Sequence, residues 1–376
     1  MCCRQRDAMN GYRSLVAAAS SVNARLAIAD CDLHLGPAAT SDLYPFMASR
    51  WRQHIETYGV SHRTGMQMGV ATYPKAQPAA CRRDAWPPSG KPPGTDLDFV
   101  RAQHLDAYNV AFGLINPPAA SQSPQNQDLA NALARALNEY QLEYLVKPEP
   151  RLGAAVVVNY EDADAAVAEI DRCAGNPAFT HVGLLSRTAD PLGNRRYLPI
   201  FAAAVRANLP VVAHAFGFGG RANTSAGWAS YYIEDMVGHA QSMQAQLVSM
   251  IVEGTFARLP SLRMVAIEGG FGWAPSLGWR LDKVWARLRD ENPVLTRLPS
   301  DYLRSQVWFT TQPMEEPQPR QHLLDAIEWI GWDRLLFASD YPHWDFDDPF
   351  LSAPPKMTET QKAGFYRENA RGLFGR

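Results

Sequence analysis

Aspartate and histidine side chains recur at the ends of short apolar segments that lie far apart in the chain. Asp32 and His34 end the first such segment, within DCDLHLGP, and His214 ends another, within LPVVAHAFG. Asp340 ends the last, within LLFASDYPH. Buried carboxylates are rare unless they are paired or coordinate a cation. Nitrogen and oxygen ligands of these types suit Zn²⁺ or Mn²⁺, which can activate a water or polarise a substrate oxygen.

These residues depend on eight apolar segments that we predict to be strands. Several are continuous apolar runs, such as AAVVV and RMVAI, which are typical of strands buried on both faces of a parallel sheet. The segments are residues 26–34, 107–116, 152–159, 180–186, 209–214, 262–268, 307–312 and 334–340. Helical patterns lie between them, at 128–146, 162–173, 195–208, 240–258, 275–291, 320–331 and 358–373. Alternating strands and helices in this number predict a (β/α)8 barrel.

In such a barrel the functional face lies at the C-terminal ends of the strands. Asp32, His34, His214 and Asp340 end the first, fifth and eighth strands, so we expect them to meet around one metal ion. Side chains alternate along a strand, so Asp30 should share their face one layer deeper and hydrogen-bond to backbone or to a ligand. The fourth strand begins near His181, which we expect on the far face, outside the site.

Three further residues are candidates for proton transfer. Glu268 ends the sixth strand, in MVAIEGGFGW, and could bind the metal, act as acid or base, or hold a ligand from behind. His239 opens the helical pattern after the fifth strand, where a helix N-terminus would lower its pKa and keep it neutral. His343 follows Asp340 by three residues. For both histidines the alternative is a structural role.

Candidate substrate-binding residues are Arg187, Phe216, Arg221 and Trp344. Arg187 follows the fourth strand and Arg221 the fifth, and either guanidinium could grip a substrate carboxylate with two hydrogen bonds. The alternative for each is a surface salt bridge. Phe216 opens the Gly-rich FGFGG, which lacks the context of a dinucleotide-binding turn and is interpreted as a turn near the site. Trp344 could line the substrate pocket with its aromatic ring.

The composition excludes several classes of protein. The 376 residues include 36 Lys and Arg against 38 Asp and Glu, a formal net charge of −2. That balance excludes a nucleic-acid binder that works through bulk positive charge. We expect no membrane association, because no apolar run approaches the roughly 18 residues that span a bilayer. Five scattered cysteines without CxxC spacing favour a reducing cytoplasm.

The domain organisation is predicted to be simple. Residues 1–25 are interpreted as a flexible N-terminal extension, and residues 26–376 as one barrel domain. After the first strand, residues 72–95 form a proline-rich insertion, ending in WPPSGKPPG, that cannot hold a helix or a central strand. It is either a surface excursion or a lid or dimer arm over the barrel mouth. The second alternative would fit a homodimer.

The chain also resembles a known family. The stretches that carry the resemblance are DCDLHLGP, LPVVAHAFG, FARLPSLRMVAIEGGFGWAPSLGWRLDK, TTQPMEEP and LLFASDYPHWDFDDP. They resemble the amidohydrolase-related family of metal-dependent hydrolases, in its aminocarboxymuconate-semialdehyde decarboxylase-like branch. The resemblance implies a distorted (β/α)8 TIM barrel with one divalent metal, Zn²⁺ first and Mn²⁺ second. The family's ligands fall on Asp32, His34, His214 and Asp340.

The chain departs from this family in three places. The first ligand is Asp32, where many relatives have His or Glu. The sixth strand carries Glu268, where many relatives have a catalytic His in an HGG-like motif. The fourth strand, THVGLLS, lacks the lysine that bridges the metals of binuclear relatives, which favours a single ion.

The expected function is metal-dependent hydrolysis of a small carboxylated or aromatic molecule. Metal-activated water would attack an acyl carbon, Asp340 would take its proton, and Glu268 or His239 would protonate the leaving group. The alternative is a metal-dependent non-oxidative decarboxylase of an aromatic or muconate-like acid, in which Asp340 or a histidine protonates the ring carbon. A second alternative is a metal-binding barrel without turnover.

Overall fold

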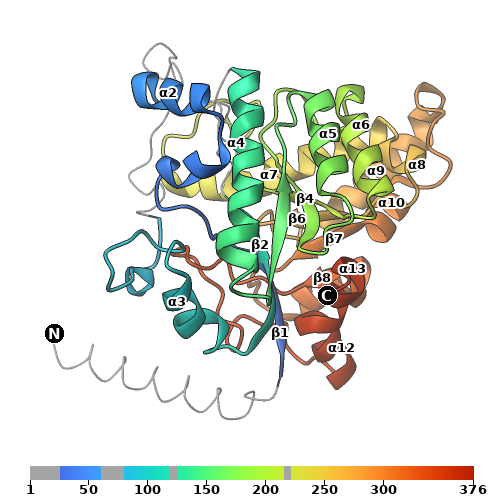
Figure 1. Cartoon of the computed structure of the whole chain (residues 1–376). Coiled ribbons are helices and arrows are strands. Elements are labelled where there is room, and N and C mark those ends of the chain that lie inside the picture. The colour runs from blue at the N-terminus through green and yellow to red at the C-terminus, as the bar shows by residue number, and fades with distance from the viewer. Residues whose placement is uncertain (1–25, 61–79, 118–125, 216–221) are drawn as a thin grey trace, which may run out of the picture.

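Eight parallel strands follow one another around a barrel, in sequence order, in the computed structural model (Figure 1). The structure describes residues 26–60, 80–117, 126–215 and 222–376. The strands are β1 (Ile28–Leu33), β2 (Val110–Ile115), β3 (Leu152–Val157), β4 (Phe179–Leu185), β5 (Val211–His214), β6 (Met264–Ile267), β7 (Val307–Thr310) and β8 (Leu335–Leu336). At the seam, the N–H groups of Cys31 and His34 donate to the carbonyls of Phe337 and Tyr341, at 3.0 and 2.8 Å. The predicted (β/α)8 TIM barrel is confirmed.

Helices surround the strands, close to the predicted positions (Figure 1). The predicted ones are α4 (Gln127–Tyr140), α5 (Ala163–Cys173), α6 (Leu198–Arg206), α7 (Tyr232–Val252), α8 (Thr255–Arg258), α9 (Ala274–Leu288), α11 (Gln321–Ile330), α12 (Glu359–Ala363) and α13 (Asn369–Phe374). Those that were not predicted are α2 (Ser49–Tyr58), α3 (Leu97–Val100) and α10 (Pro299–Gln306). α2 and α10 consist mostly of polar residues and α3 has only four residues, so their apolar periodicity is weak.

Helix α7 begins earlier than predicted, at Tyr232 rather than at residue 240. The Glu234 carboxylate accepts hydrogen bonds from the backbone N–H groups of Ser230 and Tyr231, at 2.6 and 3.0 Å, and so caps the helix start. His239 therefore lies about two turns inside the helix, not at its N-terminus. The predicted helix-end effect on this histidine is wrong.

The interior of the barrel is packed with apolar side chains that alternate along the strands with those facing the helices. The inner set is Ala29, Cys31, Phe112, Leu114, Val212, Val265, Ile267 and Leu336, and Leu373 and Phe374 of α13 join it. The other face of the strands belongs to a larger core shared with the helices. This packing leaves room for polar groups at the C-terminal ends of the strands.

The described part of the proline-rich insertion, residues 80–95, lies against the loop that follows β8. Cys81 forms an antiparallel bridge with His343, and the N–H of Trp344 donates to the carbonyl of Ala80 at 2.9 Å. The N–H of Gly36 donates to Gly94 at 3.3 Å, just beyond β1. The insertion thus touches the segments that carry His34 and His343. Its role as lid or dimer arm, and the homodimer, remain predictions.

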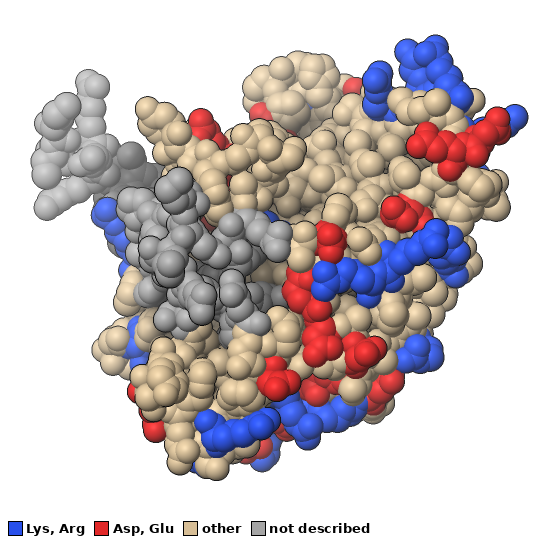
Figure 2. Space-filling model, turned by 90° about the horizontal axis from the view of Figure 1, so that it is seen from above, with Lys and Arg blue, Asp and Glu red and all other residues tan. Residues whose placement is uncertain are grey.

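Several other expectations can be compared with the structure. None of the described helices has the length and apolar character required to cross a bilayer. The face shown in Figure 2 carries basic and acidic side chains next to one another, without segregation by sign. Among the described residues, Cys31, Cys81 and Cys173 form no disulfide. The predicted extension, residues 1–25, lies outside the described residues, as do residues 72–79 of the insertion.

Candidate active site

The four predicted metal ligands converge at the C-terminal ends of β1, β5 and β8. His34 Nε2 lies 3.3 Å from Asp32 Oδ1, 2.9 Å from Asp340 Oδ1 and 3.3 Å from His214 Nε2. His214 Nε2 lies 3.5 Å from Asp32 Oδ2. Asp32, His34 and His214 each offer a ligand atom within 4.8 Å of the others, and all four side chains are buried.

Two of the polar side chains reach the site because the backbone turns sharply after their strands. Glu268 and Asp340 adopt positive φ angles, 57° and 61°. Ile267 faces the barrel interior, so regular alternation would direct Glu268 away from it. The left-handed conformation turns Glu268 back towards His214. Such backbone costs on the order of 1 kcal/mol for a residue with a side chain, so the surrounding structure must hold it in place.

Asp30 does not share the face of Asp32, and that prediction is wrong. The ladder between β1 and β2 shifts register between Asp30 and Leu33, which breaks the alternation of side chains. Asp30 accepts hydrogen bonds from Ser339 through its backbone N–H, at 2.9 Å, and its hydroxyl, at 2.6 Å, and it lies 2.7 Å from His104 Nε2. It also accepts from the backbone N–H of Asp32, at 3.3 Å, and so supports the metal-binding strand from behind.

The donor set fits a divalent cation. Two imidazole nitrogens face one another at 3.3 Å, and two carboxylates flank them. Asp32 Oδ2 is buried and accepts no hydrogen bond. A buried carboxylate oxygen without a donor is costly, and a cation removes that cost. Two nitrogen and two carboxylate donors suit Mn²⁺ or Zn²⁺.

The electrostatics of the cluster show how strongly these groups interact. Burial raises the pKa of Asp32, but His34 and His214 outweigh this effect and hold that pKa far below its usual range. Burial lowers the pKa of His34, but Asp32 and Asp340 outweigh it and raise the pKa well above its usual value. Burial likewise raises the pKa of Asp340, and His343 and His34 reverse this to a net lowering. The two aspartates are therefore ionised at neutral pH.

Glu268 and His239 lie together beside the cluster. Glu268 Oε2 is 3.1 Å from His214 Nε2, and Glu268 Oε1 is 3.6 Å from His239 Nδ1. Burial raises the pKa of Glu268 to about 8, against the opposing charge of His214, and Asp340 adds to the rise. Burial, together with the charge of Arg187, lowers the pKa of His239 to about 4. The expected neutral His239 thus agrees with the structure, but its cause is burial.

Two residues that the sequence analysis did not select complete the surroundings of Asp340. Gln312 Nε2 lies 3.2 Å from Asp340 Oδ2 and 3.2 Å from Asp345 Oδ2, and His343 Nδ1 lies 2.6 Å from Asp340 Oδ1. Burial raises the pKa of Asp345 to about 8, and Asp340 and Glu268 add to it. The position of Gln312 at the end of the seventh predicted strand could have identified it as a site residue. Asp345 lies in a loop, and no sequence pattern indicated a role for it.

The candidate substrate-binding residues fall into three groups. The Arg187 side chain is 8% exposed and forms an ion pair with Asp235 of α7, at 3.0 Å. Trp344 is half-exposed, and its Nε1 donates to the hydroxyl of Tyr232 at 3.1 Å. Phe216 and Arg221 lie outside the described residues. Contact of any of them with a substrate remains a prediction.

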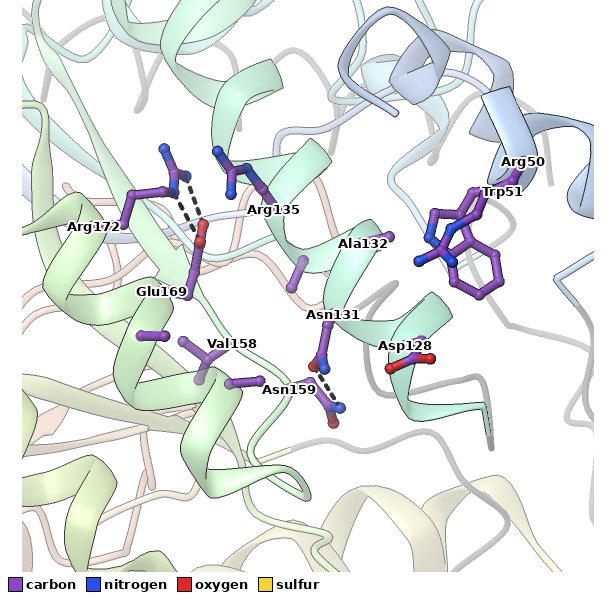
Figure 3. Close-up of a pocket in the computed structure, with 13 residues that line it drawn as sticks. Arg50, Trp51, Asp128, Asn131, Ala132, Arg135, Val158, Asn159, Glu169 and Arg172 are labelled. Carbon is purple, nitrogen blue, oxygen red and sulfur yellow. Dashed lines mark hydrogen bonds and ion pairs between the residues drawn. The ribbon is translucent and has the colours of Figure 1, made fainter. Parts of the chain in front are cut away.

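A separate groove of about 400 Å³ lies between α2, α4 and α5 (Figure 3). Within it Arg172 points at Glu169, and Asn159 donates to Asn131 at 2.9 Å. None of the predicted metal ligands lines it. We therefore place the chemistry at the strand ends, not in this groove.

The fold and the site together define a metal-binding barrel of the amidohydrolase type. The amidohydrolase family model matches residues 29–376, so the chain belongs to the amidohydrolase family. The resemblance expected from the sequence is thus confirmed.

Similar proteins indicate the branch. The chain is 25% identical over 294 residues to gamma-resorcylate decarboxylase from Rhizobium sp. (strain MTP-10005), covering 74% of this chain and 87% of that protein. A 5-carboxyvanillate decarboxylase from Sphingomonas paucimobilis has a similar structure, with a TM-score of 0.67 and 19% identity, over 93% of this chain and 99% of the other. A dihydroxybenzoic acid decarboxylase from Polaromonas sp. JS666, with bound manganese, gives a TM-score of 0.65 and 18% identity, over 93% and 97%.

These similarities overturn the expected hydrolase. The curated relatives are carboxy-lyases, which matches the alternative function from the sequence rather than the main one. At the end of the sixth strand, where many relatives are expected to have a histidine, Glu268 places its Oε2 atom 3.1 Å from His214 Nε2.

Proposed function

We propose that the chain is a metal-dependent, non-oxidative decarboxylase of an aromatic acid that carries a hydroxyl beside its carboxylate. The observation that carries this proposal is the convergence of Asp32, His34, His214 and Asp340 in a chain whose curated relatives are decarboxylases of this chemistry.

The metal would be held by the two histidines and two aspartates. When bound there, a divalent cation supplies positive charge that orients the carboxylate and hydroxyl oxygens of the substrate and stabilises negative charge on them. The sequence analysis placed Zn²⁺ before Mn²⁺. Similar structures are described with bound manganese, so Mn²⁺ is the first ion to test.

Asp340 is the proton carrier in this proposal. The reaction breaks the bond between the ring carbon and the carboxylate, the electron pair stays on the ring carbon, carbon dioxide leaves, and one proton is added to that carbon. Asp340 is ionised, so it can take a proton from the substrate hydroxyl and return it to the ring carbon; the hydroxyl regains a proton from solvent. His343 and Gln312 hold the two oxygens of Asp340 in place.

Glu268 is a second group that can hold a proton here. With a pKa of about 8 it is largely protonated at neutral pH, so its hydroxyl can donate to a substrate oxygen. Its contact with His214 also allows it to support that ligand. We assign it the proton-holding role and keep the ligand-supporting role as the alternative.

The test is product analysis with the Mn²⁺-loaded protein. A panel of aromatic hydroxy acids, including 2,6-dihydroxybenzoate and 5-carboxyvanillate, is incubated in deuterated water and separately in ¹⁸O-water. We expect carbon dioxide release, one deuterium at the carbon that carried the carboxylate, and no ¹⁸O in the aromatic product. Label from ¹⁸O-water in an aromatic product would overturn the proposal in favour of hydrolysis. Tight metal binding without turnover of any panel member would favour the non-catalytic barrel.

A further inference from the structure

The predicted ligand Asp32 is hydrogen-bonded by Asn116, which in turn contacts His181, and these two residues come from different strands of the barrel. Asn116, just beyond β2, directs Nδ2 at Asp32 Oδ1, at 2.9 Å. His181 of β4 places Nε2 3.1 Å from Asn116 Oδ1. Both residues are buried, and the expectation that His181 lies on the far face is wrong.

The donor or acceptor character of each partner determines the direction of the hydrogen bonds that link Asp32, Asn116 and His181. Asn116 Nδ2 faces two acceptors, Asp32 Oδ1 and the carbonyl oxygen of Cys31, at 2.9 and 3.1 Å. The amide nitrogen must therefore lie on that side, and Asn116 Oδ1 must accept from His181. His181 thus carries its hydrogen on Nε2, while its Nδ1 faces the hydroxyl of Thr180 at 3.1 Å. Burial lowers the pKa of His181 to about 3, which agrees with a neutral ring.

This arrangement leaves one oxygen of Asp32 available for a cation. Asn116 engages Oδ1, whereas Oδ2 is buried without a hydrogen bond and lies 3.5 Å from His214 Nε2. Without the donor on His181, Asn116 Oδ1 would be buried without that hydrogen bond, and the amide would no longer be held on both sides. The side chain could then shift, and its hydrogen bond to Asp32 would weaken.

We propose that His181 is a positioning residue for metal binding, which acts by fixing the amide of Asn116 and through it the carboxylate of Asp32. This inference rests on the metal site of the proposed function. Partners of this kind, behind a ligand, typically change metal affinity by about 10- to 100-fold.

The experiment measures Mn²⁺ affinity directly, without an activity assay. The full chain is stripped with a chelator and titrated with Mn²⁺, and free Mn²⁺ is followed by electron paramagnetic resonance. We expect His181→Phe to weaken binding by about 10-fold or more. His181→Gln keeps an N–H donor near the position of Nε2 and should retain affinity within about 3-fold. Thr255→Val, a buried polar change in α8 and outside these contacts, is the control and should bind like the wild type.

A double-mutant cycle separates positioning from packing. In an Asn116→Ala background the His181→Phe change should have no further effect on Mn²⁺ affinity, because its intermediary is gone. An equal loss in both backgrounds would show a packing effect and overturn the inference, as would wild-type affinity in His181→Phe. If circular dichroism shows that Asn116→Ala does not fold, the difference in Mn²⁺ affinity between His181→Phe and His181→Gln tests the inference instead. Failure of the wild-type protein to bind Mn²⁺ would overturn the proposed function instead.

Discussion

The Oε2 atom of Glu268 lies 3.1 Å from the Nε2 atom of His214, on the neighbouring strand of the barrel. A carboxylic acid thus stands where many relatives have a histidine, and it touches a predicted ligand. The contact exists because Glu268 adopts a positive φ of 57° directly after β6. An acid with a raised pKa in this place can hold a proton that a histidine would otherwise hold.

Glu268→Gln tests whether this residue moves a proton or binds the metal. The amide has nearly the same shape but cannot donate a carboxylic proton, so we expect Mn²⁺ binding to persist and turnover to fall by about 100-fold or more. Equilibrium dialysis gives the bound metal, and carbon dioxide release gives turnover. Loss of Mn²⁺ from the variant would instead make Glu268 a ligand.

His214→Ala tests the ligand set. The substitution removes one of two nitrogen donors, so we expect bound Mn²⁺ and activity to be lost together. The circular dichroism spectrum should stay that of the wild type, since the imidazole lies at the open end of the strands. His322→Ala, a surface change on α11, is the control and should affect neither property. If His214→Ala binds as much Mn²⁺ as the wild type, His214 is not a metal ligand.

Metal binding should weaken as the pH falls. Burial lowers the pKa of His34, but Asp32 and Asp340 raise it well above its usual value, so in the metal-free protein His34 is protonated at neutral pH. A cation needs the neutral imidazole, so the proton competes with it, and affinity rises with pH up to that pKa. Calorimetric titrations with Mn²⁺ at pH 7, in buffers of different ionisation enthalpy, should show release of about one proton per ion. Heats that do not depend on the buffer would contradict this expectation.

Gly94→Ala should disturb the metal site from the proline-rich insertion. Gly94 has a φ of 76°, and an added Cβ would collide with the carbonyl oxygen of His34. Gly90→Ala is the matched control, because Gly90 has a φ of 77° but open space around it. Both variants should lose about 1 kcal/mol of stability from backbone strain. Only Gly94→Ala should also weaken Mn²⁺ binding; equal affinities in the two variants would show that the insertion does not support His34.

The strands and most helices could be predicted because their signals are local. Short apolar segments, several of them continuous runs, marked all eight strands, and apolar periodicity marked the long helices. The positions at the ends of those strands then identified four candidate ligands, which the structure brings together: Asp32, His34, His214 and Asp340. The start of α7 was missed because a cap formed by Glu234, rather than apolar periodicity, begins that helix.

Sequence alone therefore determined the barrel, its order of strands and the donor atoms at their C-terminal ends, because strand patterns repeat over a few neighbouring residues. Only the tertiary structure decided that Asp30 turns away from the site, that Glu268 turns into it, and that His181 supports Asp32 through Asn116. A register shift, a positive φ and a contact between strands each depend on how distant segments pack together. No local pattern of residues encodes them.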